Sequence, residues 1–209
     1  FGHKGEDTVV VMNSFIFSNG GKVLDADGKC ALDSKESVEA LAYLQSLVPF
    51  APKGILNASS GDMRELFLNG SLGVEFWPAL EQPTLQKSKI DWGFENGTAP
   101  AGKTAVGTYG GWNLVVYKSS PHQEAAWKFI QFLTREDVNG AVVDLIPANG
   151  KAAKTFLDAN RKGADKIMTH LGNAQPRPLS ARYLEVSDIE VTLAQDVYSG
   201  ADPAEAAKK

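Results

Sequence analysis

The sequence contains little cysteine and histidine, two residues that often bind metals. Cys30 is the only cysteine, so no intrachain disulfide can form. His3, His122 and His170 lie far from one another and from Cys30 in the sequence. The chain has no His-Glu-x-x-His or Cys-x-x-Cys spacing, and neither of its Gly-Gly pairs fits a phosphate-binding loop. We therefore predict that the protein uses no metal and no cofactor.

Basic clusters and long hydrophobic runs are also missing. The 209 residues carry a formal net charge of −4, and the sequence pI is about 5.4. Lys and Arg are scattered along the chain, which argues against nucleic acid as a partner. The longest apolar runs are far shorter than a membrane span. The length allows one large domain or two modest lobes.

Helix and strand signals alternate along the chain. Residues 8–17 are apolar and fit either a buried strand or the last turns of a helix. Apolar spacing and capping patterns predict helices that start at Asp33 and at Ser120, with further helices over 61–70, 136–145 and 184–199. Apolar runs predict strands over 71–78 and 112–118. A helix that leads through Asn-Gly into a short strand is typical of an α/β fold.

Residues that could carry catalysis lack the partners that catalysis needs. Ser119 and Ser120 have no histidine placed by sequence to activate them, and Ser120 is explained as a helix cap. No paired carboxylate of a glycoside hydrolase can be identified. We expect that the protein is not an enzyme. The alternative from another class is a hydrolase fragment that uses Glu75 or Asp91 as an acid near Trp77.

The aromatic residues Trp77 and Trp112 stand at predicted strand ends, beside Pro78 and Gly111. Ligand clefts of α/β proteins form at strand ends, and a flat ring can stack on the C–H face of a sugar. For Trp112 a cleft position is favoured over the core, and for Trp77 both remain open. The glycine pair before Trp112 indicates that another segment or a ligand approaches the backbone closely.

Three segments resemble, in the same order, the bacterial extracellular solute-binding proteins of carbohydrate ABC importers, especially the trehalose/maltose-binding branch. They are FLNGSLGVEFW, GTYGGWNLVVYKSSPHQEAAWKFIQFLTRED and PRPLSARYLEVSDIEVTLAQDVYSGADPAEAA. One departure is that Pro78 and Leu80 occupy positions where many members have the Gly and Trp of a sugar-stacking motif. Trp77 could replace that ring, or the ligand could need less stacking.

The resemblance implies a periplasmic-binding-protein-like α/β fold, of which this chain covers mostly the C-terminal lobe. Residues 8–110 and 153–209 would form that lobe. Residues 111–152 would cross back and pack on an N-terminal lobe, so we expect the chain to be a fragment whose own N-terminal half is either a separate chain or a part that lies outside this sequence. Without that half, the crossing helix would expose Phe129, Ile130 and Leu133, an apolar patch typical of a partner surface.

The resemblance also implies a function and a site. The protein would bind a mono- or oligosaccharide between its lobes and deliver it to the permease of an ABC importer, in a bacterial periplasm or on the cell surface, as a lipoprotein in some members. An alternative is a ligand-free interaction fragment of such a protein. The resemblance, together with the aromatic residues, places the following residues at the sugar: Trp77, Gly110, Gly111, Trp112, Asn113, Arg177 and Tyr183. Arg177 could instead be an exposed loop charge, and Tyr183 could simply begin the last long helix.

Overall fold

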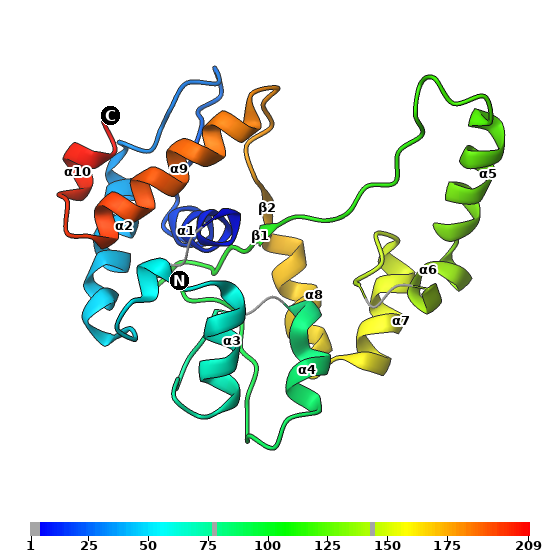
Figure 1. The fold of residues 1–209 in the computed structure, drawn as a ribbon, viewed down its shortest axis with the longest axis horizontal. Helices are drawn as coiled ribbons and strands as arrows, with labels where there is room; N and C mark the ends of the chain where they lie inside the picture. Colours follow the sequence, from blue (N-terminus) through cyan, green and yellow to red (C-terminus); the bar gives the residue numbers. More distant parts are fainter. Residues whose placement is uncertain (1–4, 77–78, 143–144) are drawn as a thin grey trace. The chain divides into compact units, whose positions relative to one another are not determined.

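The computed structural model describes residues 5–76, 79–142 and 145–209 (Figure 1). The chain forms two compact units. Unit 1 comprises residues 1–76, 96–110 and 170–209, and unit 2 comprises residues 77–95 and 111–169. The two units are defined by contacts within this chain. The lobes described above follow from the family resemblance instead, so their boundaries stay a prediction.

Unit 1 is mainly helical and contains one short parallel strand pair. Its helices are α1 (Glu6–Ser18), α2 (Lys35–Leu47), α3 (Ser60–Leu68), α9 (Tyr183–Tyr198) and α10 (Pro203–Ala206), with short 3-10 turns η1 (Val48–Phe50) and η2 (Ile55–Asn57). Its strands are β1 (Thr108–Tyr109) and β2 (Gln175–Pro176), paired in parallel with Thr108 opposite Gln175.

Unit 2 contains η3 (Ala79–Glu81), α4 (Gln82–Gln86), α5 (Gln123–Leu133), α6 (Glu136–Val142) and α7 (Gly150–Asn160). Helix α8 (Ala164–Asn173) starts in unit 2 and ends in unit 1. The small core of unit 2 is built on Phe156, Leu157 and Ile167. Helix α5 has no buried residue: Phe129 is 60% exposed, and Ile130 and Leu133 are half-buried.

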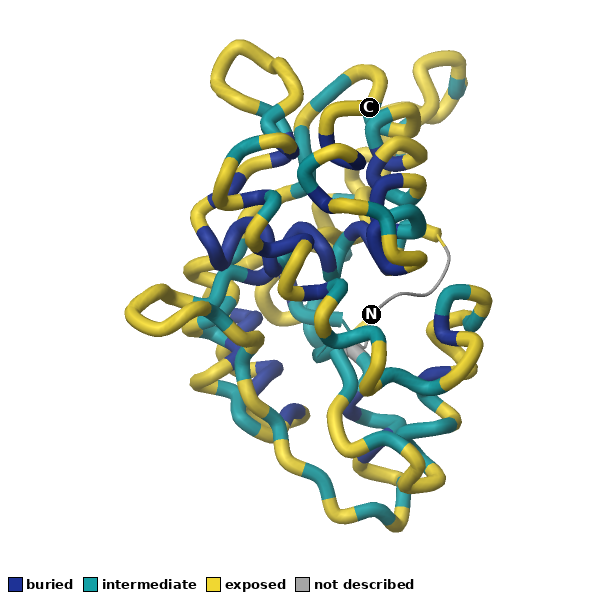
Figure 2. Tube along the Cα trace, turned by 90° about the vertical axis from the view of Figure 1, so that its left-hand side faces the viewer, coloured by how far each residue is buried: buried dark blue, intermediate teal, exposed yellow. Residues whose placement is uncertain are grey.

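The core of unit 1 lies where α1, α2 and α9 pack together (dark blue in Figure 2). Met12 and Ile16 of α1, Leu41 and Leu44 of α2, and Val197 of α9 are all fully buried. Each such side chain contributes about 1.5–3 kcal/mol through burial. The core therefore fixes α1 firmly within this unit.

The apolar run over residues 8–17 is helix α1, which settles the choice left open by its sequence. Its buried residues include Val9, Met12, Phe15, Ile16 and Phe17, which lie on several sides of the helix. A helix buried on most of its circumference has no clear polar face, so its sequence lacks the 3.6-residue period of a surface helix. This explains why the pattern could not separate helix from strand.

Both strand predictions are wrong for the residues that the structure describes. Residues 71–76 and 112–118 run without strand hydrogen bonding, and residues 77–78 fall outside the description. Apolar, β-branched residues favour a strand, but a strand also needs the backbone of a neighbour to pair with. No neighbouring backbone in the described ranges pairs with either segment.

Two predicted helix starts are displaced along the chain. Helix α2 is capped by Ser34 rather than Asp33, and the Ser34 hydroxyl accepts a hydrogen bond from the Ser37 amide at 3.4 Å. Ser120 does not cap α5, because its hydroxyl accepts from the His122 amide at 3.1 Å in a turn that precedes the helix. The predicted stop of α3 is confirmed, with Gly70 in the left-handed region at φ +79°.

Polar side chains of α1 hold the segment that leads into β1. The Ser18 hydroxyl accepts from the Val106 amide at 2.9 Å, and the Ser14 hydroxyl accepts from the Thr108 amide at 3.0 Å. Four helical residues rise about 6 Å and two extended residues about 6.6 Å, so the spacing of the two serines matches that of the Val106 and Thr108 amides. Helix α1 thus fixes the position of the segment that leads into β1.

Glu190 of α9 is fully buried in unit 1. Burial raises the pKa of this carboxyl to about 8, and the negative charge of Glu6 adds to the rise, against smaller opposing effects of Asn13 and Arg177. Glu190 is therefore mostly protonated at neutral pH.

This pKa predicts that the contribution of Glu190 to stability falls as the pH rises. The ordinary carboxyl value is 4.5, so Glu190 binds more protons in the folded state than in the unfolded state between about pH 4.5 and pH 8. Its contribution to the free energy of unfolding should fall across that range. Glu190→Gln, which imitates the protonated form, should remove this fall and raise the melting temperature at pH 8 by several degrees, as measured by circular dichroism.

Asp188→Asn is the matched control, because Asp188 is an exposed carboxylate on the same helix. This variant should keep the pH dependence of the parent protein. Equal pH dependence in the Glu190→Gln variant and the parent would show that Glu190 does not titrate in this range.

Candidate functional site

The candidate site lies where the two paired strands of unit 1 end. Gly110 follows β1 and Arg177 follows β2. Because the carboxyl ends of parallel strands meet at one edge, these two residues come together although they are far apart in the sequence. A Cβ atom added at Gly110 would lie 2.9 Å from Nη2 of Arg177.

This contact explains why a glycine is needed at one of the two adjacent positions. Gly110 leaves the space that the Arg177 guanidinium occupies, so the close approach expected from the sequence is made here by another segment of the same chain. Gly111 is different, since a Cβ atom added there would meet no described atom within 4 Å. Neither glycine has a positive φ, so the requirement at Gly110 is one of space.

The carboxylate of Glu6, in the first turn of α1, accepts hydrogen bonds from three side chains. Nη1 of Arg177 donates to Oε1 of Glu6 at 2.5 Å. The Tyr183 hydroxyl donates to the same oxygen, and the Ser187 hydroxyl donates to Oε2. The Arg177 guanidinium carbon also lies 5.4 Å from the centre of the Tyr183 ring. We call these four residues the Glu6 cluster.

The charges of the Glu6 cluster follow from these contacts. Burial raises the pKa of Glu6, but the hydrogen bonds from Ser187, Tyr183 and Arg177 outweigh it and bring the pKa below its ordinary value. Burial lowers the pKa of Arg177, and its bond to Glu6 more than restores it. Burial and the bond to Glu6 both raise the pKa of Tyr183. At neutral pH the cluster is a paired cation and anion with a neutral phenol.

The structure brings three of the predicted site residues together, namely Gly110, Arg177 and Tyr183. Arg177 is half-buried and ion-paired, so it is not a free loop charge, and Tyr183 is the first residue of α9 as well as a member of the cluster. Trp112 is 86% exposed and Asn113 is exposed, and both belong to unit 2. Trp77 lies outside the described residues. The role of each in ligand binding stays a prediction.

The sequence reasoning missed Glu6 and Ser187. Ser187 lies four residues after Tyr183, which places both on one face of a helix, and it is buried. A small polar residue on the inward face of an apolar helix was the signal that could have pointed to it. The only signal at Glu6 was that acidic residues are common in the first turn of a helix, and this preference does not indicate a site.

The remaining chemical candidates lie elsewhere. Among the described residues, no group of three or more His, Cys, Asp or Glu side chains is placed to hold a metal ion. Glu75 is half-buried in unit 1 and Asp91 is exposed in unit 2. An acid role for either one stays an alternative.

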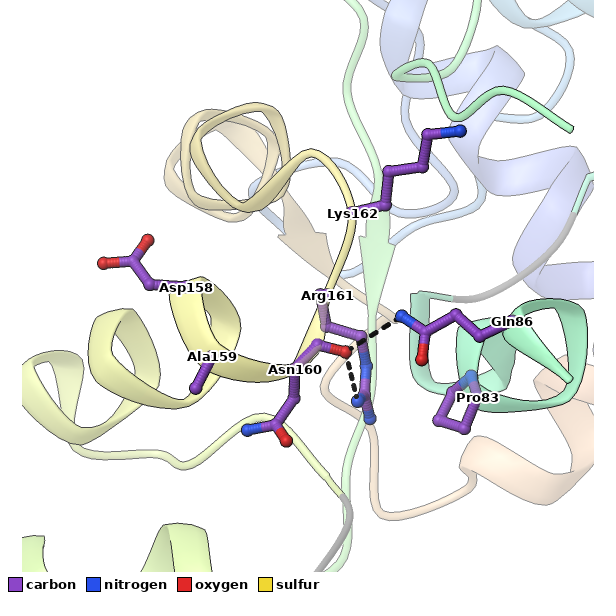
Figure 3. Close-up of a pocket in the computed structure, with 7 residues that line it drawn as sticks. All are labelled: Pro83, Gln86, Asp158, Ala159, Asn160, Arg161 and Lys162. Atoms are coloured by element: carbon purple, nitrogen blue, oxygen red, sulfur yellow. Dashed lines mark hydrogen bonds between the residues drawn. The ribbon is translucent and has the colours of Figure 1, made fainter.

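Unit 2 has an open hollow of about 480 Å³ between α4 and the end of α7 (Figure 3). There the Gln86 side chain and Nη1 of Arg161 both donate to the Asn160 carbonyl, at 3.2 and 3.1 Å. The hollow contains none of the predicted site residues.

No described helix is long and apolar enough to cross a membrane.

Comparison with known proteins gives consistent matches. Residues 2–140 match the model of the family described as bacterial extracellular solute-binding protein. The maltose-bound MalE3 of T. maritima is 30% identical, with a TM-score of 0.82, and the match covers 99% of this chain and 56% of that one. A solute-binding protein of an ABC transporter from Thermotoga lettingae, bound with alpha-D-tagatose, is 27% identical, with a TM-score of 0.79, over 99% of this chain and 55% of that one.

A curated relative gives the same family. The maltooligosaccharide ABC transporter solute-binding lipoprotein of Streptococcus pneumoniae is 24% identical over 199 residues, which cover 90% of this chain and 47% of the relative. The chain spans about half the length of the curated relatives it matches.

These matches confirm the predicted periplasmic-binding-protein-like fold, of which this chain forms a part. They also confirm the predicted resemblance to sugar-binding proteins of ABC importers. The family model covers well over half of the chain. The chain therefore belongs to the family of bacterial extracellular solute-binding proteins.

Proposed function

We propose that this chain binds a mono- or oligosaccharide and that the protein delivers the sugar to an ABC importer. The observation that carries the proposal is the Glu6 cluster beside Gly110, which presents a half-buried arginine and a tyrosine at the end of a strand pair. Support also comes from similar proteins solved with maltose and with alpha-D-tagatose.

The electrostatics of the cluster favour a neutral, hydroxyl-rich ligand. The Arg177 charge is paired with Glu6, and the whole chain has a net charge of −4, so an anion gains little here. The guanidinium still has N–H groups beyond the one used on Glu6, in a planar fork that suits neighbouring sugar hydroxyls. A hydroxyl can accept from these groups without needing a net positive site.

Aromatic stacking would supply the apolar part of sugar binding. Trp112 has an 86% exposed ring directly after the glycine pair, and we propose that this ring covers one face of the sugar. Asn113 would contribute its amide and Gly111 a close backbone approach, with Trp77 as a second ring. Closure of two lobes around the ligand would then favour the bound state.

We propose that a further polypeptide half completes the cleft. The chain spans about half of its curated relatives, and α5 leaves apolar side chains uncovered, among them Phe129 at 60% and Trp127 at 56% exposure. An N-terminal half that packs on residues 111–152 would cover them. The permease of the importer is the second proposed partner.

The proposed location is the bacterial periplasm or cell surface. The family is described as extracellular, and the Streptococcus pneumoniae relative is a lipoprotein. A binding protein for an importer has to meet its sugar outside the cytoplasmic membrane.

Replacement of the proposed stacking ring should weaken sugar binding. Trp112→Ala should lower the affinity for maltose roughly 10-fold, since an aromatic stack contributes about 1.4 kcal/mol. The measurement is isothermal titration calorimetry of the protein assembled with its N-terminal half. Phe50→Ala is the control, because Phe50 is an 87% exposed aromatic residue of unit 1, outside both the predicted site and residues 111–152.

The same titration tests the function as a whole. Maltose, trehalose and tagatose should be tried in turn, and the bound sugar should be recovered unchanged by chromatography. Binding of none of these sugars would contradict the proposal, and turnover of an oligosaccharide would favour the hydrolase alternative.

Gly110→Ala should displace the Arg177 guanidinium, because the added methyl group would lie 2.9 Å from Nη2. We expect the sugar affinity to fall about 10-fold through the lost hydroxyl contacts. Gly73→Ala is the control, since a Cβ atom there meets nothing within 4 Å and Gly73 has no positive φ. An unchanged affinity in Gly110→Ala would mean that Arg177 does not contact the sugar.

Native mass spectrometry of the protein isolated from its own cells tests the proposed second half. We expect a complex heavier than the 22.4 kDa of this chain. Phe129→Ser should weaken that complex, whereas Phe50→Ser, which changes an 87% exposed residue of unit 1, should not. A stable species of 22.4 kDa alone would refute the second half.

A further inference from the structure

We propose that Glu6 is a positioning residue of the sugar site, which holds Arg177 and Tyr183 in one fixed arrangement. This inference rests on the proposed function for the nature of the ligand. The arrangement itself is a property of this chain, since all members of the Glu6 cluster belong to unit 1.

The contacts leave Arg177 and Tyr183 dependent on Glu6. Glu6 accepts a hydrogen bond from each of the two side chains. Arg177 is also hydrogen-bonded to Tyr183, so the three side chains form one connected group in which Glu6 bonds both of the others. Arg177 lies in the connector between β2 and α9, in which Leu179 is 91% exposed. A long guanidinium side chain on such a connector samples many rotamers unless a partner holds it. The Glu6 carboxylate is that partner.

Glu6 itself is held by a rigid element. It lies about one turn before Val9 and two turns before Met12 of α1, and both of these residues are fully buried. The same helix binds the segment before Gly110 through Ser14 and Ser18. One buried helix therefore sets the positions of both Gly110 and Arg177, and a site built on such an element keeps its geometry.

The geometry favours positioning over direct contact of Glu6 with a sugar. Its Oε1 accepts from Arg177 and Tyr183, and its Oε2 accepts from Ser187. A carboxylate accepts about four hydrogen bonds, so little capacity remains for sugar hydroxyls. The groups left to face a ligand are the other N–H groups of Arg177 and the Tyr183 ring.

The test compares Glu6→Gln with Glu6→Asp and with a matched control. Glu6→Gln removes the charge and one acceptor, whereas Glu6→Asp keeps the charge. Glu185→Gln is the control, since Glu185 also bonds an arginine, Arg182, but is exposed and outside the cluster. Each variant is measured in the protein assembled with its N-terminal half, by calorimetry with maltose and tagatose.

A second readout does not depend on any sugar. The Cζ signal of Tyr183 in the carbon NMR spectrum, assigned with Tyr183→Phe, reports the hydrogen bond to Glu6. Lowering the pH from neutral to about 3 should shift this signal as Glu6 is protonated, with a midpoint below the ordinary glutamate value of 4.5. Glu190, the other carboxyl that acts on Tyr183, has a pKa of about 8 and is therefore mostly protonated at neutral pH and fully protonated near the expected midpoint.

We expect Glu6→Gln to abolish the titration of Tyr183 and to lower the sugar affinity about 10-fold. Glu6→Asp should restore part of both, and Glu185→Gln should change neither. Loss of the titration with unchanged affinity would reduce Glu6 to a structural ion pair and overturn the proposal. Loss of affinity with an unchanged titration would also overturn it, because Glu6 would then bind the sugar directly.

The two proposals fail in different ways. If the parent protein binds neither sugar, the proposed function fails, and the Tyr183 titration still decides whether Glu6 holds the cluster. If the parent protein binds a sugar and Glu6→Gln changes neither readout, only the positioning role fails.

Discussion

The burial of α1 is the constraint on which the rest of unit 1 depends. Its apolar side chains fill the space between α2 and α9, and its few polar side chains are used to hold other segments. Ser14 and Ser18 bind the approach to β1, and Glu6 binds the connector after β2. Because the apolar contacts fix the helix, these weaker polar contacts have a defined geometry and need not supply the stability themselves.

Two carboxyl groups of unit 1 show how burial and hydrogen bonding compete. Glu6 and Glu190 are both removed from water, and burial raises the pKa of each. Three donors outweigh burial at Glu6, so it is ionised, whereas Asn13 and the charge of Arg177 do not outweigh it at Glu190. The resulting pair, one charged and one neutral, avoids two negative charges beside a single arginine.

The family assignment depended on short sequence motifs, which can be identified without any knowledge of the tertiary structure. The Gly-Gly-Trp segment, the helix after it and the Arg-Pro connector occur in family order, and residues 2–140 match the family. The helices at α3 and α9 were also predictable from apolar spacing. The strands predicted over 71–78 and 112–118 are absent from the described part of these segments, because a strand exists only if another backbone pairs with it.

The sequence by itself determined the family, the α/β class and several helices, because these depend on residue types at short spacings along the chain. Only the tertiary structure decided that residues 8–17 form a helix, that Gly110 makes room for Arg177, and that Glu6 joins Arg177 to Tyr183. Glu6 and Arg177 are 171 residues apart. Contacts at that separation follow from how the helices pack, and no local pattern encodes them.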